Sequence, residues 1–481
     1  MLSRIFKNVA SLAVASIMDK MAYVVLFAII ARKLTRSEFG TYNLVLTLIF
    51  IGGMIVNFGM EGVIIREVAK SREKASVFFA NSVFLALLFS LVSWPLMFGL
   101  AYVLKLGPDV IFLMGFGGGV FVFMGFAQMA SAVIKGHERM DIFAGASICL
   151  SLIGFGLSML ALWVWGDISW LVGAFFVTEG LRAVVLIYIV HRRFAVLRWQ
   201  LDRQVITQIF RLSVPFALLM AYGVLSHRTD LLMMGWLKPL DEVAVYGMAA
   251  KFADFLSLIT GSLTGALYPL LSKKVMSARE ELWGLYNESI AVFAIVGFGA
   301  ALAVMVLAQP LISFLFGDKY LLGVTALRWL AWGFLFSTLS GPIGILLLAS
   351  GDQMNRLLML GILLLGCNIF LNIWLIPLYS YNGAALSSFL TIVLGFIGRL
   401  ILSRKYFGRL PNLVRVGWRA LSASLLMGFV LSFLTKSSII VSVIIGGVTY
   451  FGGLALFGEF REARYEPIKL KILQFLSRSS A

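Results

Sequence analysis

Two charged residues, Arg228 and Asp230, interrupt the otherwise apolar stretch GVLSHRTDLLMMG at residues 223–235. A guanidinium can bind a phosphate group through two parallel hydrogen bonds, whereas a carboxylate can bind a proton or a cation. Residues two apart lie about 200° apart around a helix, so Asp230 is poorly placed to neutralise Arg228. The spacing predicts different roles on different sides of one helix. The neighbouring His227 could titrate near neutral pH, although such a lone histidine more commonly hydrogen-bonds a neighbour.

Other apolar segments also contain charged residues. The cations are Lys20, Arg182, Arg228, Lys251, Arg328, Arg399 and Arg419, and the anions are Asp19, Glu61, Glu179, Asp230, Asp254 and Glu288. In a membrane span each charge costs about 2.5 to 3.5 kcal/mol on insertion scales, and it usually faces a cavity or a partner. Two pairs are spaced i, i+3 and can neutralise themselves locally: Glu179 with Arg182, and Lys251 with Asp254.

The composition indicates the elements that must carry these residues. The 481-residue chain is 60% hydrophobic and 13% charged, whereas soluble domains contain about 25% charged residues. An apolar run of about 20 residues spans a bilayer as a helix. The sequence therefore predicts an all-α polytopic membrane protein. Its first run, at residues 10–31, is too long for a removable signal peptide and lacks a small-residue cleavage site.

We expect about fourteen transmembrane helices from the apolar runs. Their expected ranges are 10–31, 41–64, 77–104, 110–134, 142–165, 168–190, 213–236, 244–271, 284–308, 322–349, 357–376, 383–402, 418–435 and 438–458.

Lysine and arginine concentrate in alternate loops, which include the clusters at 66–74, 192–211, 273–279 and 404–415. The opposite loops contain only Arg32, Lys33, Arg36, Lys105, Lys238, Lys319 and Lys436. Because positive loops remain cytoplasmic, both termini are expected in the cytoplasm of a multi-pass cell-membrane protein. This bias accounts for most of the net charge of +17. The charge therefore indicates anionic lipids rather than nucleic acid as partners.

A weak internal repeat predicts two lobes. The segment at 31–44, ARKLTRSEFGTYNL, resembles the segment at 235–248, GWLKPLDEVAVYGM. In this alignment Glu38 corresponds to Glu242 and Tyr42 to Tyr246. An even number of helices per repeat gives two parallel six-helix lobes around a central cavity. The expected domains are a lobe at 1–195, a second lobe at 196–410, and two additional helices with a basic cytoplasmic tail at 411–481.

Several stretches together resemble the polysaccharide-exporter flippases of the multidrug, oligosaccharidyl-lipid and polysaccharide exporter superfamily. They are ARKLTRSEFGTYNL (31–44), LSVPFALLMAYGVLSHRTDLLMMG (212–235), VYGMAAKF (245–252), LYPLLSKK (267–274), LISFLFGDKY (311–320) and NIFLNIWLIPLYSYNGAALSS (368–388). Each stretch is degenerate, and their order and spacing make the match specific. One departure is Ser380, where the family pattern usually has glycine.

The resemblance implies alternating-access export of a polyprenyl-diphosphate-linked oligosaccharide across the cytoplasmic membrane, with ion coupling expected. It implies no enzyme activity, catalytic residue, cofactor or resident metal. The implied partners are the lipid-linked oligosaccharide and membrane lipids, with glycan-assembly proteins as further candidates.

A diphosphate cargo would need fixed cations. Counting along the predicted helices places Arg228 about 22 Å from the cytoplasmic edge and Lys251 about 10 Å from the outer edge, so the two share a level. Lys20 lies near the middle of the first predicted helix. We therefore expect Lys20, Arg228 and Lys251 to bind the diphosphate. The alternative is that Lys251 is neutralised by Asp254, and Lys20 by Asp19 or Glu61.

Four carboxylates are candidates for coupling-ion binding or charge pairing: Asp19, Glu61, Asp230 and Asp254. The sequence does not choose between a proton and a sodium ion.

Two other functions fit the membrane class. A cation-coupled exporter of amphiphilic drugs is expected to favour carboxylates over cations in its cavity, and Lys20, Arg228 and Lys251 disfavour it. A glycan polymerase or ligase usually has a large external loop, whereas every external connection expected here is short. The sequence also has no recognisable nucleophile, metal-ligand cluster or ATP-binding motif.

Overall fold

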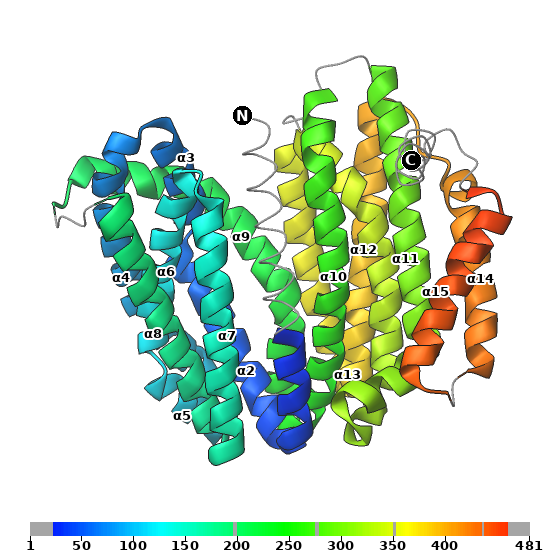
Figure 1. Ribbon diagram of the computed structural model, residues 1–481, viewed down its shortest axis with the longest axis horizontal. Coiled ribbons are helices and arrows are strands. Elements are labelled where there is room, and N and C mark those ends of the chain that lie inside the picture. Colours follow the sequence, from blue (N-terminus) through cyan, green and yellow to red (C-terminus); the bar gives the residue numbers. More distant parts are fainter. Residues whose placement is uncertain (1–22, 196–199, 275–278, 350–352, 435–436, 460–481) are drawn as a thin grey trace, which may run out of the picture. The chain divides into compact units, whose positions relative to one another are not determined.

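The computed structural model describes residues 23–195, 200–274, 279–349, 353–434 and 437–459 (Figure 1). These residues form helices joined by short connections, with no strand among them. The helices are α2 (Arg36–Asn57), α3 (Met60–Lys70), η1 (Arg72–Lys74), α4 (Ala75–Val103), α5 (Pro108–Phe116), α6 (Gly119–Gly136), α7 (Met140–Val164), α8 (Ile168–Arg193), α9 (Arg203–Leu237), α10 (Leu240–Lys274), α11 (Arg279–Phe316), η2 (Asp318–Gly323), α12 (Val324–Ala349), α13 (Met354–Phe407), α14 (Leu413–Phe433) and α15 (Ile439–Leu456).

Twelve helical segments in the described ranges are long and apolar enough to cross a membrane. The predicted first helix, 10–31, is described only from residue 23, and residues 23–33 are helical. The predicted helices 357–376 and 383–402 both lie within α13. The all-α polytopic membrane class is therefore confirmed.

Two predicted spans contain a break that their hydropathy did not indicate. The span expected at 41–64 is divided into α2 and α3 at Phe58 and Gly59, which have φ angles of 44° and 73°. A Cβ atom at residue 59 would lie 2.6 Å from the backbone nitrogen of Ala217, so α9 can approach this break closely because residue 59 is glycine. The span expected at 110–134 is similarly divided into α5 and α6.

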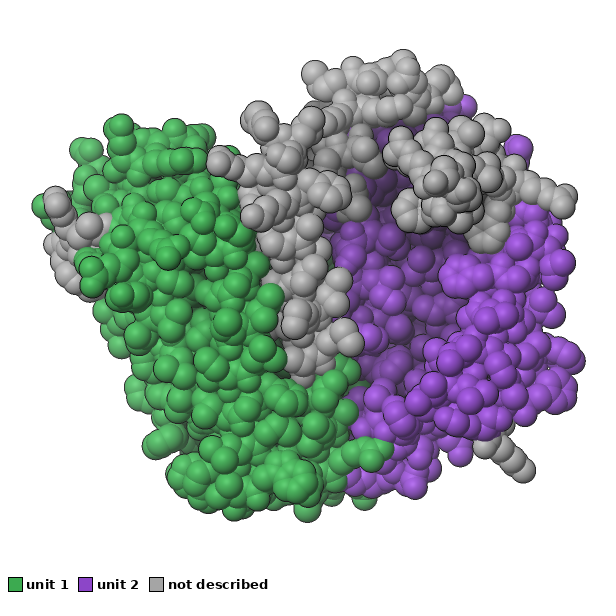
Figure 2. All heavy atoms as spheres, in the orientation of Figure 1, with its two compact units in different colours: residues 1–248, 368–384 green, residues 249–367, 385–481 purple. Residues whose placement is uncertain are grey.

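The helices form two compact units, which are coloured separately in Figure 2. Unit 1 comprises residues 1–248 and 368–384, and unit 2 comprises residues 249–367 and 385–481. Helices α10 and α13 contribute to both. The lobe boundaries expected from the sequence, at 195/196 and 410/411, stay a prediction.

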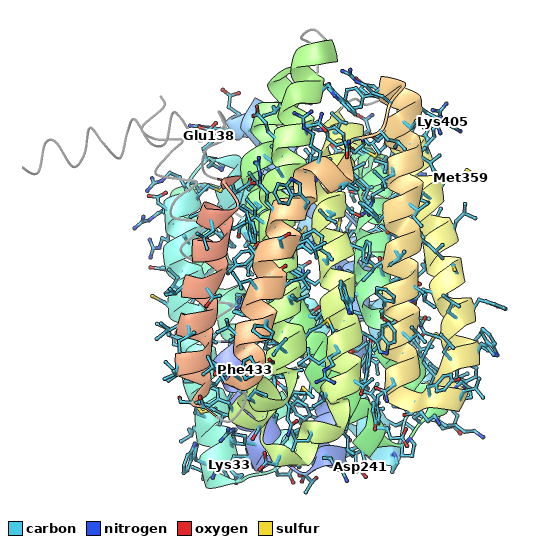
Figure 3. All side chains as sticks on the ribbon, turned by 90° about the vertical axis from the view of Figure 1, so that its right-hand side faces the viewer. Lys33, Glu138, Asp241, Met359, Lys405 and Phe433 are labelled. Atoms are coloured by element: carbon cyan, nitrogen blue, oxygen red, sulfur yellow. The ribbon has the colours of Figure 1, made fainter. Side chains whose placement is uncertain are left out.

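Opposite ends of unit 1 carry different loops. Lys33 and Asp241 lie at one end and Glu138 at the other (Figure 3). The Lys33 ammonium lies 4.2 Å from the centre of the Trp163 ring, which brings the loop after α7 to the first end. At the Glu138 end, the carboxylate of Glu138 lies 3.8 Å from the guanidinium of Arg72.

The basic connections of unit 1 therefore lie at one end and the other connections at the opposite end, as the charge pattern predicted. The ring of His137 lies 4.9 Å from that of Phe194, which adds the connection after α8 to the Glu138 end. The clusters at 66–74 and 192–193 thus lie with Glu138 at one end, which we call the basic end. The placement of the termini relative to a membrane stays a prediction.

Helix α13 turns sharply at Ser380, which has φ 53° and ψ −132°. L-residues rarely adopt this conformation, whereas glycine adopts it freely. The Ser380 hydroxyl donates a hydrogen bond to the Glu242 carboxylate, which ties the turn to the start of α10 within unit 1. The serine in place of the family's usual glycine therefore places strain on the backbone.

In unit 2, the hairpin of α14 and α15 packs against α11. The Tyr450 hydroxyl donates to the backbone carbonyl of Ile295 over 2.6 Å. Leu431 and Leu454 are fully buried or nearly so at this contact. These are the two additional helices that the sequence predicted at 418–435 and 438–458.

Candidate functional site

Helix α9 positions the charged stretch identified in the sequence. Its N-cap, Asp202, accepts hydrogen bonds from the backbone N–H groups of Gln204 and Val205 at 2.8 and 3.4 Å. The backbone N–H of Asp202 donates to the side chain of Asn81 on α4 over 2.9 Å. These contacts fix the start of α9, and the helix then runs for 35 residues, about 52 Å at 1.5 Å per residue.

Arg228 lies on a half-buried side of α9. Its guanidinium carbon lies 4.9 Å from the centre of the Phe50 ring on α2. The face of an aromatic ring attracts a cation, so this contact helps to hold the guanidinium in place. Arg228 is thus held in a position from which it can bind an anionic group.

Asp230 is 6% exposed and accepts two hydrogen bonds within unit 1. The Tyr246 hydroxyl of α10 donates to one carboxylate oxygen over 2.9 Å. The Asn372 side-chain amide of α13 donates to the other over 2.7 Å, and also to the side-chain oxygen of Asn368 over 3.1 Å. The structure thus separates Asp230 from the aromatic contact of Arg228, as the two-residue spacing predicted.

The cluster around Asp230 is rich in oxygen atoms. The side-chain oxygen of Asn372 is fully buried and accepts no hydrogen bond from the residues that the structure describes. Carboxylate and amide oxygens are the ligands that hard cations prefer, and a buried carboxylate can instead hold a proton. The arrangement can therefore accommodate a small cation or a proton.

Sequence reasoning missed three residues of this cluster as site residues: Tyr246, Asn368 and Asn372. A signal for two of them was present, since Asn368 and Asn372 are amides at i, i+4 in an otherwise apolar span. Such a spacing places both on one helix face. Tyr246 was noted only as part of the internal repeat.

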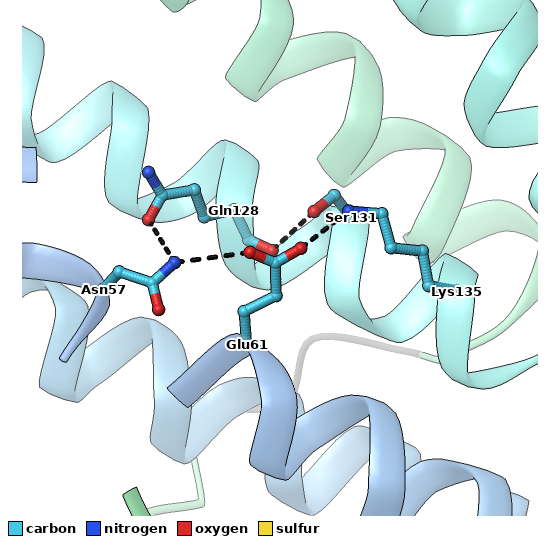
Figure 4. Close-up of polar contacts among 5 residues, drawn as sticks. All are labelled: Asn57, Glu61, Gln128, Ser131 and Lys135. Carbon is cyan, nitrogen blue, oxygen red and sulfur yellow. Dashed lines mark hydrogen bonds and ion pairs between the residues drawn. The ribbon is translucent and has the colours of Figure 1, made fainter. Parts of the chain in front are cut away.

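Glu61 forms a separate polar cluster between α3 and α6 (Figure 4). Its carboxylate lies 2.6 Å from the Lys135 ammonium and accepts a 3.4 Å hydrogen bond from the Asn57 amide. The same amide donates to the Gln128 side chain over 2.9 Å, and the Ser131 hydroxyl donates to the Gln128 backbone carbonyl over 2.8 Å. The Glu61–Lys135 contact is a charge pair between α3 and α6, and the Asn57–Glu61 hydrogen bond joins the two sides of the α2–α3 break.

The remaining candidates lie elsewhere. In unit 2, the Lys251 ammonium lies 3.9 Å from the Asp254 carboxylate, as the i, i+3 spacing allowed. Lys251 is 8% exposed. Arg228 belongs to unit 1, so the common level of Arg228 and Lys251 stays a prediction. Lys20 and Asp19 lie outside the described residues.

The expected local pair on α8 is confirmed. A guanidinium nitrogen of Arg182 lies 3.1 Å from the Glu179 carboxylate. Within the described ranges, no group of three or more His, Cys, Asp or Glu side chains could hold a metal ion.

The chain is similar to two curated bacterial proteins. An uncharacterized membrane protein in the cps region of Klebsiella pneumoniae is 23% identical over 331 residues, which are 68% of this chain and 67% of that protein. The capsular polysaccharide biosynthesis protein CapF of Staphylococcus aureus is 25% identical over 181 residues, which are 37% of this chain and 46% of CapF.

Solved structures show the same fold. The lipid II flippase MurJ, in an inward closed conformation, superposes with a TM-score of 0.78 at 13% identity over 93% of this chain and 98% of its own. The eukaryotic MATE transporter AtDTX14 superposes with a TM-score of 0.60 at 14% identity over 88% and 99%. The chain therefore has the fold of these transporters.

Two sequence-family models match the chain. The MatE model matches residues 215–374. The polysaccharide biosynthesis protein model matches residues 5–275, more than half of the chain. This match confirms the resemblance inferred from the motifs, and the chain belongs to the polysaccharide biosynthesis protein family.

Proposed function

We propose that this protein translocates a polyprenyl-diphosphate-linked oligosaccharide across the cytoplasmic membrane by alternating access, driven by an ion gradient. The reaction involves no covalent chemistry. It moves an anionic, polar head group past hydrocarbon, which requires a wet path and fixed cations. Membership of the polysaccharide biosynthesis protein family and the similarity to CapF favour this function, and the transporter fold is compatible with it.

The main support for the proposal is that α9 is little buried and yet contains charged and polar side chains. In the most apolar 18-residue stretch of α9, only 11% of the residues are buried. This is the smallest fraction among the twelve candidate spans of the described ranges. Yet this span contains the exposed His227 and the half-buried Arg228. A lipid-facing surface would make those residues costly, so α9 is better suited to a water-filled path.

In this proposal, Arg228 binds the diphosphate, together with Lys20 and Lys251. The guanidinium supplies bidentate hydrogen bonds, and the two ammonium groups add positive charge. Asp230 binds the coupling ion with the amide oxygens of Asn368 and Asn372. Because Arg228 and Asp230 share one helix, displacement of α9 would affect both sites.

The proposal includes an orientation in the cell membrane. The basic end of unit 1 faces the cytoplasm, as do both termini, because positively charged loops are retained on that side. The end with Lys33 and Asp241 then faces outward.

Translocation in reconstituted vesicles tests the function. Purified protein would be placed in vesicles that contain a fluorescent polyprenyl-diphosphate oligosaccharide, and inward and outward pools would be distinguished with an impermeant quencher. Wild-type protein should move the lipid, and Arg228→Gln should abolish movement while inserting normally. The matched control is Arg193→Gln, which removes the same charge from the exposed last residue of α8. Normal movement by Arg228→Gln would reject its assigned role, and no movement by the wild type would reject the function.

The MatE match at 215–374 favours a second candidate, a cation-coupled exporter of amphiphilic drugs. Such an exporter would extrude cationic dyes from vesicles or cells and would not depend on a phosphate-binding arginine. Dye efflux that persists in Arg228→Gln, without any movement of the lipid-linked glycan, would select this alternative.

A further inference from the structure

The first nine residues of α9, 203–211, are unlike the rest of the helix. At about 52 Å, α9 exceeds the roughly 30 Å hydrocarbon core. The connection after α9 leads to Asp241, which lies at one end of unit 1 (Figure 3). The start of α9 is hydrogen-bonded to Asn81 of α4, the helix that follows η1 and its Arg72–Glu138 contact at the basic end. The apolar sequence begins at Leu212. Residues 203–211 therefore form a polar segment at the basic end, before the apolar part of α9.

This extension has one buried face and one polar face. Ile209 and Ser213 are fully buried. The polar face comprises Arg203, Gln204, Thr207, Gln208 and Arg211, all exposed. At 100° per residue these five fall within about 140° of the helix circumference, on the side opposite Ile209 and Ser213. The polar face is thus a continuous ladder and not a set of scattered surface residues.

The polar face lines a cavity of about 540 Å³, whose described lining is this face together with Leu212. Within the described part of the chain, the side chains of Arg203, Gln204, Gln208 and Arg211 form no hydrogen bond or ion pair. Two guanidinium and two amide groups therefore line one cavity. Guanidinium groups suit phosphate oxygens, and amides suit sugar hydroxyls.

Arg203 and Arg211 lie at the two ends of the polar face, eight residues apart, which is about 12 Å along the helix axis. Gln204, Thr207 and Gln208 lie between them.

We propose that the polar face of α9 is a capture site for the diphosphate-sugar head group, occupied before the cargo reaches Arg228. This inference rests on the proposed function and adds a second site on the same helix. Arg211 binds the diphosphate, the amides bind the first sugars, and Arg203 binds a more distal anionic or hydroxyl group. Arg228 lies 17 residues farther along α9, about 25 Å away, so the two sites are distinct.

Binding measurements test the capture site. The full-length protein would be reconstituted in nanodiscs of uncharged phosphatidylcholine and titrated with an undecaprenyl diphosphate that carries one hexose. The double variant Arg203→Gln/Arg211→Gln should bind this probe about tenfold more weakly than the wild type at low salt, with Arg193→Gln unchanged. Because exposed charges are screened, the difference should shrink at about 1 M salt. In vesicles the variant should need a higher lipid concentration for half-maximal movement but reach a near-normal maximal rate.

A labelling experiment locates the probe independently. Thr207→Cys, in a background without the two native cysteines, should react with a water-soluble maleimide and should be protected by the undecaprenyl diphosphate hexose. Equal protection by phosphatidylglycerol would identify a site for bulk anionic lipid and would overturn the inference. So would unchanged binding by the double variant, or an absence of protection.

Failure of the capture site differs from failure of the function. If wild type and the double variant move the lipid-linked glycan with equal concentration dependence, only the capture site is rejected. If the wild type neither binds nor moves any polyprenyl diphosphate, both proposals are rejected.

Discussion

The contact between Asp230 and Asn372 permits a charge-swap experiment. In Asn372→Asp, a second carboxylate replaces an amide nitrogen that lies 2.7 Å from a carboxylate oxygen of Asp230. Asp230 is 6% exposed and residue 372 is fully buried, so water cannot screen the repulsion. The two carboxylates must then share a proton or a cation.

The cost follows from the proton that must be held. Aspartate normally protonates near pH 3.9, about three pH units below neutrality, and each unit corresponds to about 1.4 kcal/mol. Keeping one proton on the pair at pH 7 therefore costs about 4 kcal/mol. This penalty is absent at pH values where an unfolded aspartate is itself protonated, and it grows as the pH rises. A cation bound between the carboxylates would remove it.

The rescue variant is the swap Asp230→Asn/Asn372→Asp, which restores one carboxylate and one amide at the same contact. Unfolding of detergent-purified protein would be measured between pH 5 and 8 in sodium or choline chloride. Asn372→Asp should be destabilised at pH 7 in choline and should recover at low pH or, if the site takes sodium, in sodium chloride. The swap should be close to the wild type in all conditions, because the interaction energy of a contacting pair is recovered in the double variant.

Two results would refute this reasoning. One is wild-type stability of Asn372→Asp at pH 7 in choline, which would mean that the two carboxylates do not meet. The other is a swap variant no more stable than Asn372→Asp, which would mean that the contact is not the source of the loss. Asp230→Asn alone is the matched control, because it removes the charge and keeps the shape.

Three further predictions follow from unit 1. Ser380→Gly should be more stable than Ser380→Ala by about 1 to 3 kcal/mol in chemical unfolding, because both lose the hydroxyl and only glycine relieves the positive φ; equal stability would contradict the strain. Each of the single variants Glu61→Gln and Lys135→Met should be less stable than the double variant, because a single change leaves one charge unpaired. A double variant whose loss of stability equals the sum of the two single losses would exclude a coupled pair. In intact cells, an impermeant maleimide should label Asp241→Cys but should label Glu138→Cys only after permeabilisation; the reverse pattern would invert the proposed orientation.

The sequence alone determined the class of the protein and the positions of most spans. Insertion depends on the mean apolarity of about 20 consecutive residues, which is a local property, so α4, α7, α8, α14 and α15 begin and end within a few residues of their predicted ranges. The separation of Arg228 from Asp230 was also predictable, because the 100° rotation per residue holds in any α-helix. The family motifs placed the chain among polysaccharide biosynthesis proteins.

The tertiary structure alone decided what those charges contact. Asp230 meets Asn372 from 142 positions away, and Glu61 meets Lys135 from 74 positions away. Such pairings depend on how two helices are rotated and how deep each is placed, and neither quantity is encoded in a local window. The break at Phe58–Gly59 escaped prediction for a related reason. The interruption between the predicted helices 357–376 and 383–402 was expected and contains Ser380, but the positive φ of Ser380 was not predicted. The mean hydropathy of about 20 residues does not depend on the backbone angles of one or two of them. Those angles nevertheless redirect α3 and α13, and so decide which polar side chains meet.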